Sequence, residues 1–410
     1  MVGAVQGFDF RVLGGLLLVA ALVAIASQRL RLPYSAGLVV AGLAVAWVAP
    51  GATPPLTPGL IYFVFLPPLV FEAAIQIPWR PLRRELPLLA VLVTLGVALA
   101  ALVVAAGMHW LVGWSWLGAG LFGVLIAATD PVSVIAAFKQ LHVRPRLHLL
   151  VEAESLLNDG VAAVGFAILA GIAGGGAASA GAVAGKLVIT VLGGCACGAA
   201  VAVPLILLAG RTEDRLVEVT LTQVIAYGAF LIAEHLHCSG VLATLTAGLI
   251  VGNWGFLGSI SDGGRQGVLN HWEFVAFLIN SVIFLLIGGQ AVRMPMAAVL
   301  TAAAIAVALS LAGRAATVYP VTLAFARSRL RVPWGYKHVL FWGGLRGALA
   351  LALALALPPL PERGEIVTVA FAVVAFSILV QGLTMPWLIG RLGLRQGAST
   401  VSTGTGAVSG

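Results

Sequence analysis

Four acidic residues, Glu72, Asp130, Glu154 and Asp159, lie inside stretches that are otherwise apolar. A carboxylate in the hydrocarbon core of a bilayer costs ~2.5–3.5 kcal/mol on insertion scales, so its presence indicates a functional site. At ~1.5 Å per helical residue, Glu72 and Asp130 lie ~21 Å and Asp159 ~18 Å from the ends of their apolar runs. These depths coincide near the middle of a core ~30 Å thick. Carboxylates at one depth could bind a cation, and the sequence therefore predicts a protein that binds and moves one.

Asp130 is followed by a proline, in Thr129-Asp130-Pro131. A proline within a helix removes one backbone donor and clashes with the carbonyl four residues earlier. Carbonyls freed in this way are tolerated at membrane depth only where they line a cavity or find other donors. An unwound turn with free carbonyls, such as those near Thr129, beside the carboxylate of Asp130 is a common form of cation site in transporters. A simple proline kink would leave the same pattern, and these residues alone do not distinguish the two.

A second polar block lies on one helix and contains Glu154, Ser155, Asn158 and Asp159. The pairs 154/158 and 155/159 are four residues apart and share a broad helix face. Asp159 would supply an anionic oxygen and Ser155 a neutral one, which are ligand types that suit an alkali cation. Asn158 would brace unwound backbone without adding charge. The alternative is a buried polar network that only packs helices together.

Three acids, Glu72 among them, are harder to place from the sequence. Glu72 follows Pro67 and Pro68, which predict a bend just before it. It is either a third cation ligand or a structural hydrogen-bond acceptor, and the sequence leaves both open. Glu152 and Glu234 lie nearer the ends of apolar segments, where we expect their side chains to reach water.

Arg314 and Arg346 are the two cationic residues inside apolar segments. Arginine does not deprotonate in proteins, so a buried one must be paired. We expect Glu154 to pair with one of them, and Arg314 is the first choice. Arg346 lies in the glycine-rich stretch 343–347, which should interrupt its helix as the turn at Asp130 interrupts an earlier one. Two matched breaks in the two halves of a chain are typical of the inverted repeats of secondary transporters.

The elements that position these residues are predicted to be transmembrane helices. The chain has 410 residues, 60% of them hydrophobic and 9% charged, with a mean hydropathy of +1.07. Soluble domains are less apolar, and runs of ~20 apolar residues, long enough to span a bilayer, recur along the chain. We predict an all-α polytopic membrane protein whose residues 1–390 form one transmembrane domain. Its thirteen expected spans are 9–27, 35–50, 58–77, 86–108, 116–138, 147–173, 183–208, 217–236, 239–253, 272–291, 297–326, 337–357 and 365–390.

The distribution of positive charge predicts how these spans are oriented. The net charge of +8 comes from lysine and arginine in short loops, so we expect no nucleic-acid partner. Seventeen of the 23 lysines and arginines fall on one side of the predicted spans, four on the other and two inside. This asymmetry predicts a cell-membrane protein with an external N-terminus and a cytoplasmic C-terminus. Residues 391–410 should form a short disordered cytoplasmic tail.

The cysteines do not predict a metal or redox site. Cys195, Cys197 and Cys238 are too few and too poorly spaced for a disulfide framework or a transition-metal site, so we interpret them as packing residues. No cofactor is expected beyond the transported ions.

Five stretches together resemble the sodium/proton antiporters of the cation/proton antiporter superfamily, in particular the NhaP and NHE type. They occur in the family's order and cover residues 9–390. The stretches are Phe65-Leu66-Pro67-Pro68 with Glu72, Thr129-Asp130-Pro131-Val132, Glu154-Ser155-Leu156-Leu157-Asn158-Asp159, Ser239-Gly240-Val241-Leu242-Ala243 and Phe341-Trp342-Gly343-Gly344-Leu345-Arg346-Gly347-Ala348.

The resemblance implies a thirteen-helix fold with inverted repeats and two broken, crossing helices, 116–138 and 337–357. It also implies a core bundle made of segments three to six and ten to thirteen. The remaining helices would form a homodimer interface.

The resemblance further implies a cation site made by Thr129, Asp130, Ser155 and Asp159, with Glu72 as a further candidate ligand. Asn158 would brace the crossed helices. Glu154 would pair with an arginine such as Arg314. The adjacent Asn and Asp at the site are typical of electroneutral members.

We therefore predict a Na⁺ or Li⁺/proton antiporter that exchanges one cation for one proton by alternating access at a midplane carboxylate site. Asp159 and Asp130 would each bind either a cation or a proton. The ligand types do not separate Na⁺ from K⁺, so a K⁺/H⁺ antiporter is an alternative, and a cation channel is a more distant one. We expect no enzyme, because no nucleophile and base lie at one depth.

Overall fold

Helices make up the regular secondary structure of this protein, as predicted. The computed structural model describes residues 10–30, 33–49, 53–174 and 180–395. Within those ranges every named element is an α-, π- or 3-10 helix, and one isolated bridge joins Val143 to Arg395. The first residues of the expected disordered tail are therefore ordered, because Leu394 is buried against the helices. The rest of that tail, from 396 on, lies outside the described residues.

Each predicted apolar segment coincides with a helix or with two half-helices. Eight of the described helices are long and apolar enough to cross a membrane by length and composition. The others are shorter, so the total of thirteen crossings stays a prediction. In chain order the helices are α1 (Phe10–Leu30), α2 (Tyr34–Val48), η2 (Leu60–Phe65), α3 (Leu66–Gln76), α4 (Trp79–Val91), η3 (Leu92–Gly96), α5 (Val97–Gly107), η4 (Met108–Val112), α6 (Trp116–Leu125), α7 (Val132–Leu141), α8 (Pro145–Ala173), α9 (Ala180–Ala209), α10 (Arg215–His235), α11 (Gly240–Asn253), η5 (Gly255–Leu257), α12 (Asp262–Ala291), η6 (Met296–Val299), α13 (Leu300–Ala324), α14 (Trp334–Trp342), α15 (Ala348–Leu355), α16 (Arg363–Phe376), η7 (Ser377–Gly382) and α17 (Leu383–Arg391).

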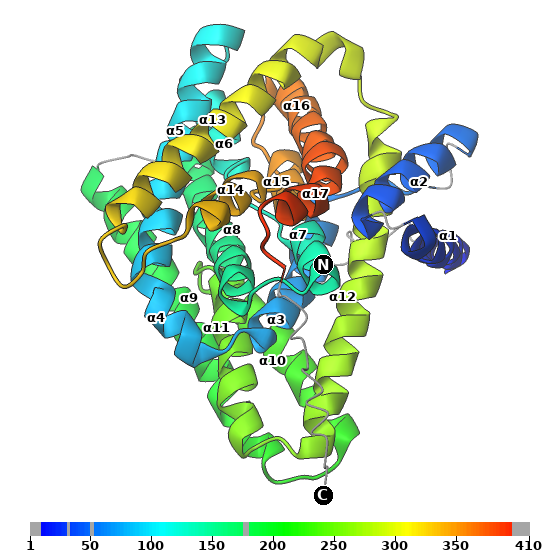
Figure 1. Cartoon of the computed structure of the whole chain (residues 1–410), viewed down its shortest axis with the longest axis vertical. Helices are drawn as coiled ribbons and strands as arrows, with labels where there is room; N and C mark the ends of the chain where they lie inside the picture. Colours follow the sequence, from blue (N-terminus) through cyan, green and yellow to red (C-terminus); the bar gives the residue numbers. More distant parts are fainter. Residues whose placement is uncertain (1–9, 31–32, 50–52, 175–179, 396–410) are drawn as a thin grey trace, which may run out of the picture.

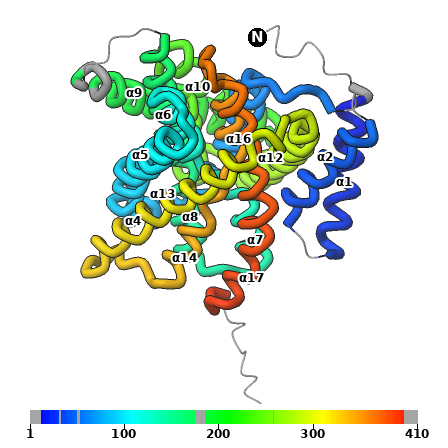
Figure 2. The backbone as a smooth tube through the Cα atoms, turned by 90° about the horizontal axis from the view of Figure 1, so that it is seen from above, coloured from blue at the N-terminus to red at the C-terminus, as the bar shows by residue number. Residues whose placement is uncertain are grey.

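The helices pack in groups around the broken segments (Figure 1). α1 and α2 lie together on one flank and pack against α12 (Figure 2). α9, α10 and α11 pack against one another, and α11 also packs against α3. α5 packs between α6 and α13. The half-helix α15 contacts α6, α8 and α16, and it is buried from Ala348 to Ala354. A helix that is apolar all round belongs in such an interior position.

Glycines allow some of these helices to approach closely. A Cβ added to Gly42 of α2 would lie 2.0 Å from the carbonyl oxygen of Leu285 in α12. A Cβ added to Gly288 of α12 would lie 2.0 Å from the carbonyl oxygen of Val39 in α2. The contact between α2 and α12 therefore needs glycine on both helices, as is common where membrane helices pack backbone to backbone.

The helix that carries Glu72 contains a π-helical turn where we expected a simple proline bend. The π turn η2 ends just before Pro67 and Pro68. Pro68 has no N–H to donate to the carbonyl of Val64. The hydroxyl of Tyr227 in α10 donates to that carbonyl instead, at 3.0 Å. A side chain from another helix thus completes the backbone hydrogen bonding that the proline interrupts.

Candidate cation-binding site

The two broken helices meet at their breaks. α6 ends at Leu125 and α7 begins at Val132, while α14 ends at Trp342 and α15 begins at Ala348. The backbone N–H of Asp130, in the first break, donates to the carbonyl of Leu345, in the second, at 2.8 Å. The crossing of segments 116–138 and 337–357 therefore follows from direct backbone contact between residues that are far apart in the sequence.

Arg346 ties the two breaks together. Its Nη1 donates to the carbonyls of Ala127 at 3.0 Å and Ala128 at 3.2 Å. Its Nε and Nη2 donate to Ser310 Oγ at 3.3 and 3.1 Å. In the described part of the chain Arg346 forms no ion pair, although we expected buried arginines to be paired with acids. The unwound carbonyls take the place of a carboxylate because they carry partial negative charge and lack helical donors at this depth.

Asp130 lies between the N-termini of two half-helices. Its Oδ1 accepts a hydrogen bond from the N–H of Val132, at the start of α7, at 2.9 Å. A Cβ added to Gly347, just before α15, would lie 2.1 Å from Asp130 Oδ2. The carboxylate is therefore packed against the start of α15 as well. Helix N-termini favour negative charge, so the two half-helices offset part of the cost of burying this carboxylate.

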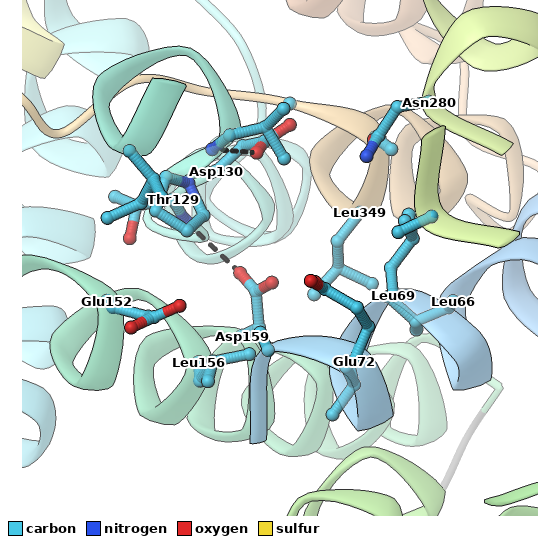
Figure 3. Close-up of a pocket in the computed structure, with 18 of the residues that line it drawn as sticks. Leu66, Leu69, Glu72, Thr129, Asp130, Glu152, Leu156, Asp159, Asn280 and Leu349 are labelled. Carbon is cyan, nitrogen blue, oxygen red and sulfur yellow. Dashed lines mark hydrogen bonds between the residues drawn. The ribbon is translucent and has the colours of Figure 1, made fainter. Parts of the chain in front are cut away.

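Thr129 connects the first break to α8, as Figure 3 shows. Its N–H donates to Asp159 Oδ1 at 3.2 Å, and its hydroxyl donates to Ser155 Oγ at 3.0 Å. Asn158 Nδ2 donates to the Thr129 hydroxyl at 3.2 Å. Asn158 therefore holds the unwound segment in place, which is the geometry its predicted bracing role requires. Its Oδ1 is buried and has no hydrogen-bond partner among the described residues.

Glu154 and Arg314 form the buried ion pair that was our first choice. Arg314 Nη1 and Nη2 donate to the two carboxylate oxygens of Glu154 at 2.6 and 2.9 Å. Nη2 and Nε also donate to the carbonyl of Leu340 in α14, at 2.8 and 3.2 Å. This two-point contact satisfies both charges within the protein. Glu154 is thereby directed toward α13 and α14, and it is not among the residues that line the cavity beside Asp159.

One cavity of about 260 Å³ brings together Glu72, Thr129, Asp130 and Asp159. Glu72 reaches it from α3, and its carboxylate points toward Asp159 in Figure 3. Glu72 also accepts a hydrogen bond from Gln76 Nε2. Ser155 does not line the cavity and contacts it only through Thr129. Four of the five predicted ligands therefore line the cavity, and the fifth, Ser155, lies behind Thr129.

A further acid, Glu152, also lines the cavity. Glu152 of α8 lines the wall, so our expectation that it reaches water near a helix end was wrong. Its side chain is only 13% exposed, and its Oε2 lies 3.5 Å from His148 Nε2. Glu152 precedes Asp159 by seven residues, which is two helical turns, so both side chains lie on one face. This spacing was the signal in the sequence that could have identified it.

Helix α12 adds a second pair with the same spacing. Glu273 and Asn280 are seven residues apart and both line the cavity. Lys139, at the end of α7, lies at the rim and is exposed. The cavity therefore runs from the midplane acids to a rim with charges of both signs.

Comparison with known proteins identifies the family. Residues 16–390 match the transmembrane sodium/hydrogen exchanger family. The chain belongs to the sodium/hydrogen exchanger family. The family that the motifs predicted is therefore confirmed.

Several members of the family and a solved structure resemble the chain closely enough to compare. It is 40% identical over 381 residues to the Na(+)/H(+) antiporter ApNhaP of Aphanothece halophytica, which covers 92% of this chain and 73% of the relative. It is 39% identical over 371 residues to the low-affinity Na(+)/H(+) antiporter NhaS1 of Synechocystis, over 89% of this chain and 70% of the relative. The structure of the sodium proton antiporter MjNhaP1 from Methanocaldococcus jannaschii at pH 8 has a TM-score of 0.72 and 19% identity, over 93% of this chain and 97% of that one. This similarity confirms the predicted fold class.

Proposed function

We propose that this chain exchanges one Na⁺ for one proton across the membrane, at the cavity that Asp130 and Asp159 share. The observation that carries the proposal is the contact between the first break and α8, where Thr129 N–H donates to Asp159 Oδ1. That contact brings Asp159 to the cavity that Asp130 also lines. The relatives named as Na(+)/H(+) antiporters support the same activity. Li⁺ would bind to the same oxygen ligands.

In this proposal Asp159 is the group that exchanges its proton. Its Oδ2 makes no hydrogen bond to the described residues, while Oδ1 accepts only one. A cation entering the cavity would be bound by Asp159, with oxygen atoms of Asp130, Thr129 and Glu72 close by. A proton on Asp159 removes the charge that the cation needs. Cation and proton therefore exclude each other, and this competition couples the two fluxes.

The stoichiometry of one to one follows from the different surroundings of the two aspartates. Asp130 is packed against the N-termini of α7 and α15, which favour its ionised form in every step. Asn158 cannot carry a proton, and Glu154 is paired with Arg314. Asp159 is then the one acid of the polar block on α8 that is free to titrate, and each cycle moves no net charge.

Alternating access would expose this cavity to each side of the membrane in turn. The cavity reaches Gln76 and Lys139, which are exposed residues at the ends of α3 and α7. In the orientation predicted from positive charge, both ends are cytoplasmic. We therefore interpret this conformation as the inward-facing one. The cavity would open to the other side of the membrane when the bundle around the crossing helices moves against α1, α2 and α9 to α11. We propose that the homodimer forms through these same five helices.

The test is proton movement in proteoliposomes that contain a pH-sensitive dye, on addition of Na⁺, Li⁺ or K⁺ in turn. Asp159→Asn should reduce cation-driven proton movement to the level of protein-free vesicles, and Asp130→Asn should be nearly as severe. The matched control is Glu213→Gln, an exposed acid in the turn between α9 and α10. Retention of most of the exchange by Asp159→Asn at saturating Na⁺ would show that the site is elsewhere.

The same vesicles separate the alternatives. A response to K⁺ that equals the response to Na⁺ would favour a K⁺/H⁺ antiporter. A cation channel would pass Na⁺ without any proton moving in the opposite direction when the membrane potential is clamped.

A further inference from the structure

A second cavity, of about 760 Å³, lies beside the transport cavity, and Gln76 lines both. It is formed where α3 turns into α4, where α11 ends and where α12 begins. Trp79 and Arg80 line it from the α3–α4 turn, Trp254 and Phe256 from the end of α11, and Arg265 from α12. No acidic residue is among the described residues that line it.

Asn253 fixes the floor of this cavity. Its Oδ1 accepts a hydrogen bond from the backbone N–H of Trp79 at 2.7 Å. Its Nδ2 donates to the carbonyls of Ile77 at 3.0 Å and Leu249 at 2.8 Å. One side chain at the end of α11 thus clamps the whole α3–α4 turn, and this clamp sets the positions of Trp79 and Arg80 beside Trp254.

The two arginines that line the cavity have no acidic partner among the described residues. Arg80 is exposed and has no hydrogen bond or ion pair within the described residues. The Arg265 guanidinium lies over the Phe256 ring, 5.3 Å from its centroid, and makes no ion pair in the described chain. The Trp79 and Trp254 rings lie 5.9 Å apart, and Trp254 is 52% exposed. The surroundings therefore favour a ligand with a negative charge and an apolar part.

In the predicted transmembrane arrangement this cavity lies at a membrane surface. The long apolar helices that begin at Trp79 and at Asp262 start there, and α11 ends there. Tryptophan is enriched at the level of lipid headgroups, where the ring is in contact with both apolar and polar groups. Basic pockets between helices at this level bind acidic lipid headgroups.

We propose that this cavity binds the phosphate headgroup of an anionic phospholipid. Arg80 and Arg265 would contact the phosphate, and the Trp79 and Trp254 rings would pack against the glycerol and the first acyl carbons. A zwitterionic lipid would bind less well, because its ammonium group would find two arginines and no carboxylate. The bound lipid would bridge the α3–α4 turn and the end of α11.

The test uses the purified full chain in detergent after removal of native lipid, titrated with phosphatidylglycerol and followed by native mass spectrometry. Arg80→Gln combined with Arg265→Gln should weaken phosphatidylglycerol binding roughly 25-fold, since each arginine near an anionic lipid contributes about fivefold. Arg80→Lys with Arg265→Lys keeps both charges and should retain most of the binding. Arg211→Gln, an exposed arginine in the α9–α10 turn, is the matched control and should bind as the unmodified protein does.

Three outcomes would overturn the proposal. The double glutamine variant could keep its affinity for phosphatidylglycerol. Phosphatidylcholine could bind the unmodified protein equally well. Millimolar inorganic phosphate could displace the lipid completely, which would make this a site for free phosphate. The melting temperature of each variant without lipid, compared with that of the unmodified protein, verifies that a loss of binding is not a loss of fold.

Discussion

At the scale of single residues, the buried ion pair of Glu154 and Arg314 leads to a prediction about stability. Glu154→Gln would remove the carboxylate charge that Arg314 contacts, and would leave the guanidinium with two neutral acceptors, the glutamine amide oxygen and the Leu340 carbonyl. Breaking a buried pair costs ~3–5 kcal/mol in soluble proteins. We therefore expect a clear loss of thermal stability in detergent, measured by tryptophan fluorescence on heating, with exchange retained at low temperature.

A double variant provides the control. Glu154→Gln with Arg314→Gln should recover part of the lost stability, because neither partner is then left charged and alone. A double variant whose destabilisation equals the sum of the two single ones would contradict a direct interaction.

Glu152 provides a different residue-scale test, because it lines the cavity without contacting the unwound break. At a pH high enough to ionise Glu152, Glu152→Gln removes one negative charge from the path to Asp159. A cavity lined with negative charge raises the local concentration of cations, and this can raise their association rate ~10-fold or more at low ionic strength. We expect the KM for Na⁺ to rise ~10-fold at low salt, with the maximal rate retained, and the difference to shrink as salt is added.

Glu213→Gln, which removes an exposed acid outside the cavity, should leave the KM unchanged and serves as the control. An unchanged KM in Glu152→Gln would mean that this acid does not attract the cation.

Some residues of the candidate site could be predicted from the sequence and others could not, for physical reasons. Depth within an apolar run identified Asp130 and Asp159, because an acid is costly there wherever the helix faces. The same criterion missed Glu152, since distance from a helix end says nothing about which face a side chain is on. Charge pairing predicted the partner of Arg314 correctly. It failed for Arg346, because backbone carbonyls without donors do not appear as charges in a sequence.

At the scale of the elements, the meeting of α7 and α15 at Asp130 depends on the absence of a side chain at Gly347. Gly347→Ala would place a methyl group where the Asp130 carboxylate lies, 2.1 Å from Oδ2. The carboxylate would have to leave one helix N-terminus. We expect exchange to fall nearly as far as in Asp130→Asn, measured by the same dye assay.

A glycine in open space serves as the control for this substitution. A Cβ at Gly364, in α16, would meet no atom within 4 Å, and alanine is the better helix former. Gly364→Ala should therefore exchange normally. Full activity in Gly347→Ala would mean that Asp130 does not need both helix ends.

The helices themselves were predicted well, because apolar runs and the prolines and glycines between them mark where helices start, break and end. Pro131 and the glycines at 343–347 located both breaks. The π turn at η2 was not predicted, since hydrophobic patterns average over a turn and do not distinguish π from α winding. The hydrogen bond from Asp130 N–H to Leu345 O could not be predicted either, because backbone hydrogen bonds between distant segments do not depend on residue type.

At the scale of the whole molecule, the sum of the charges leads to a prediction about membrane potential. In the exchange that we propose, Asp130 stays ionised and Asp159 exchanges one proton for one cation, so no net charge crosses in a cycle. An imposed potential should leave the Na⁺/H⁺ exchange rate unchanged in vesicles clamped with valinomycin and K⁺, provided that K⁺ is not itself transported. A rate that rises steeply with potential would mean that a second proton is carried, and Glu72 would be the acid to test next.

The crossing of the broken helices also has a consequence for how the protein is made. Ala127 receives its hydrogen bond from Arg346, which is 219 residues later in the chain. At ~5–20 residues per second of synthesis, that donor arrives roughly 10 to 45 s after the first break leaves the ribosome. During this interval the first break has unsatisfied carbonyls and an acid, and a bare bilayer does not stabilise such a segment. We therefore expect the nascent chain to keep α6 and α7 in contact with water or with the insertion machinery until α14 and α15 have been made.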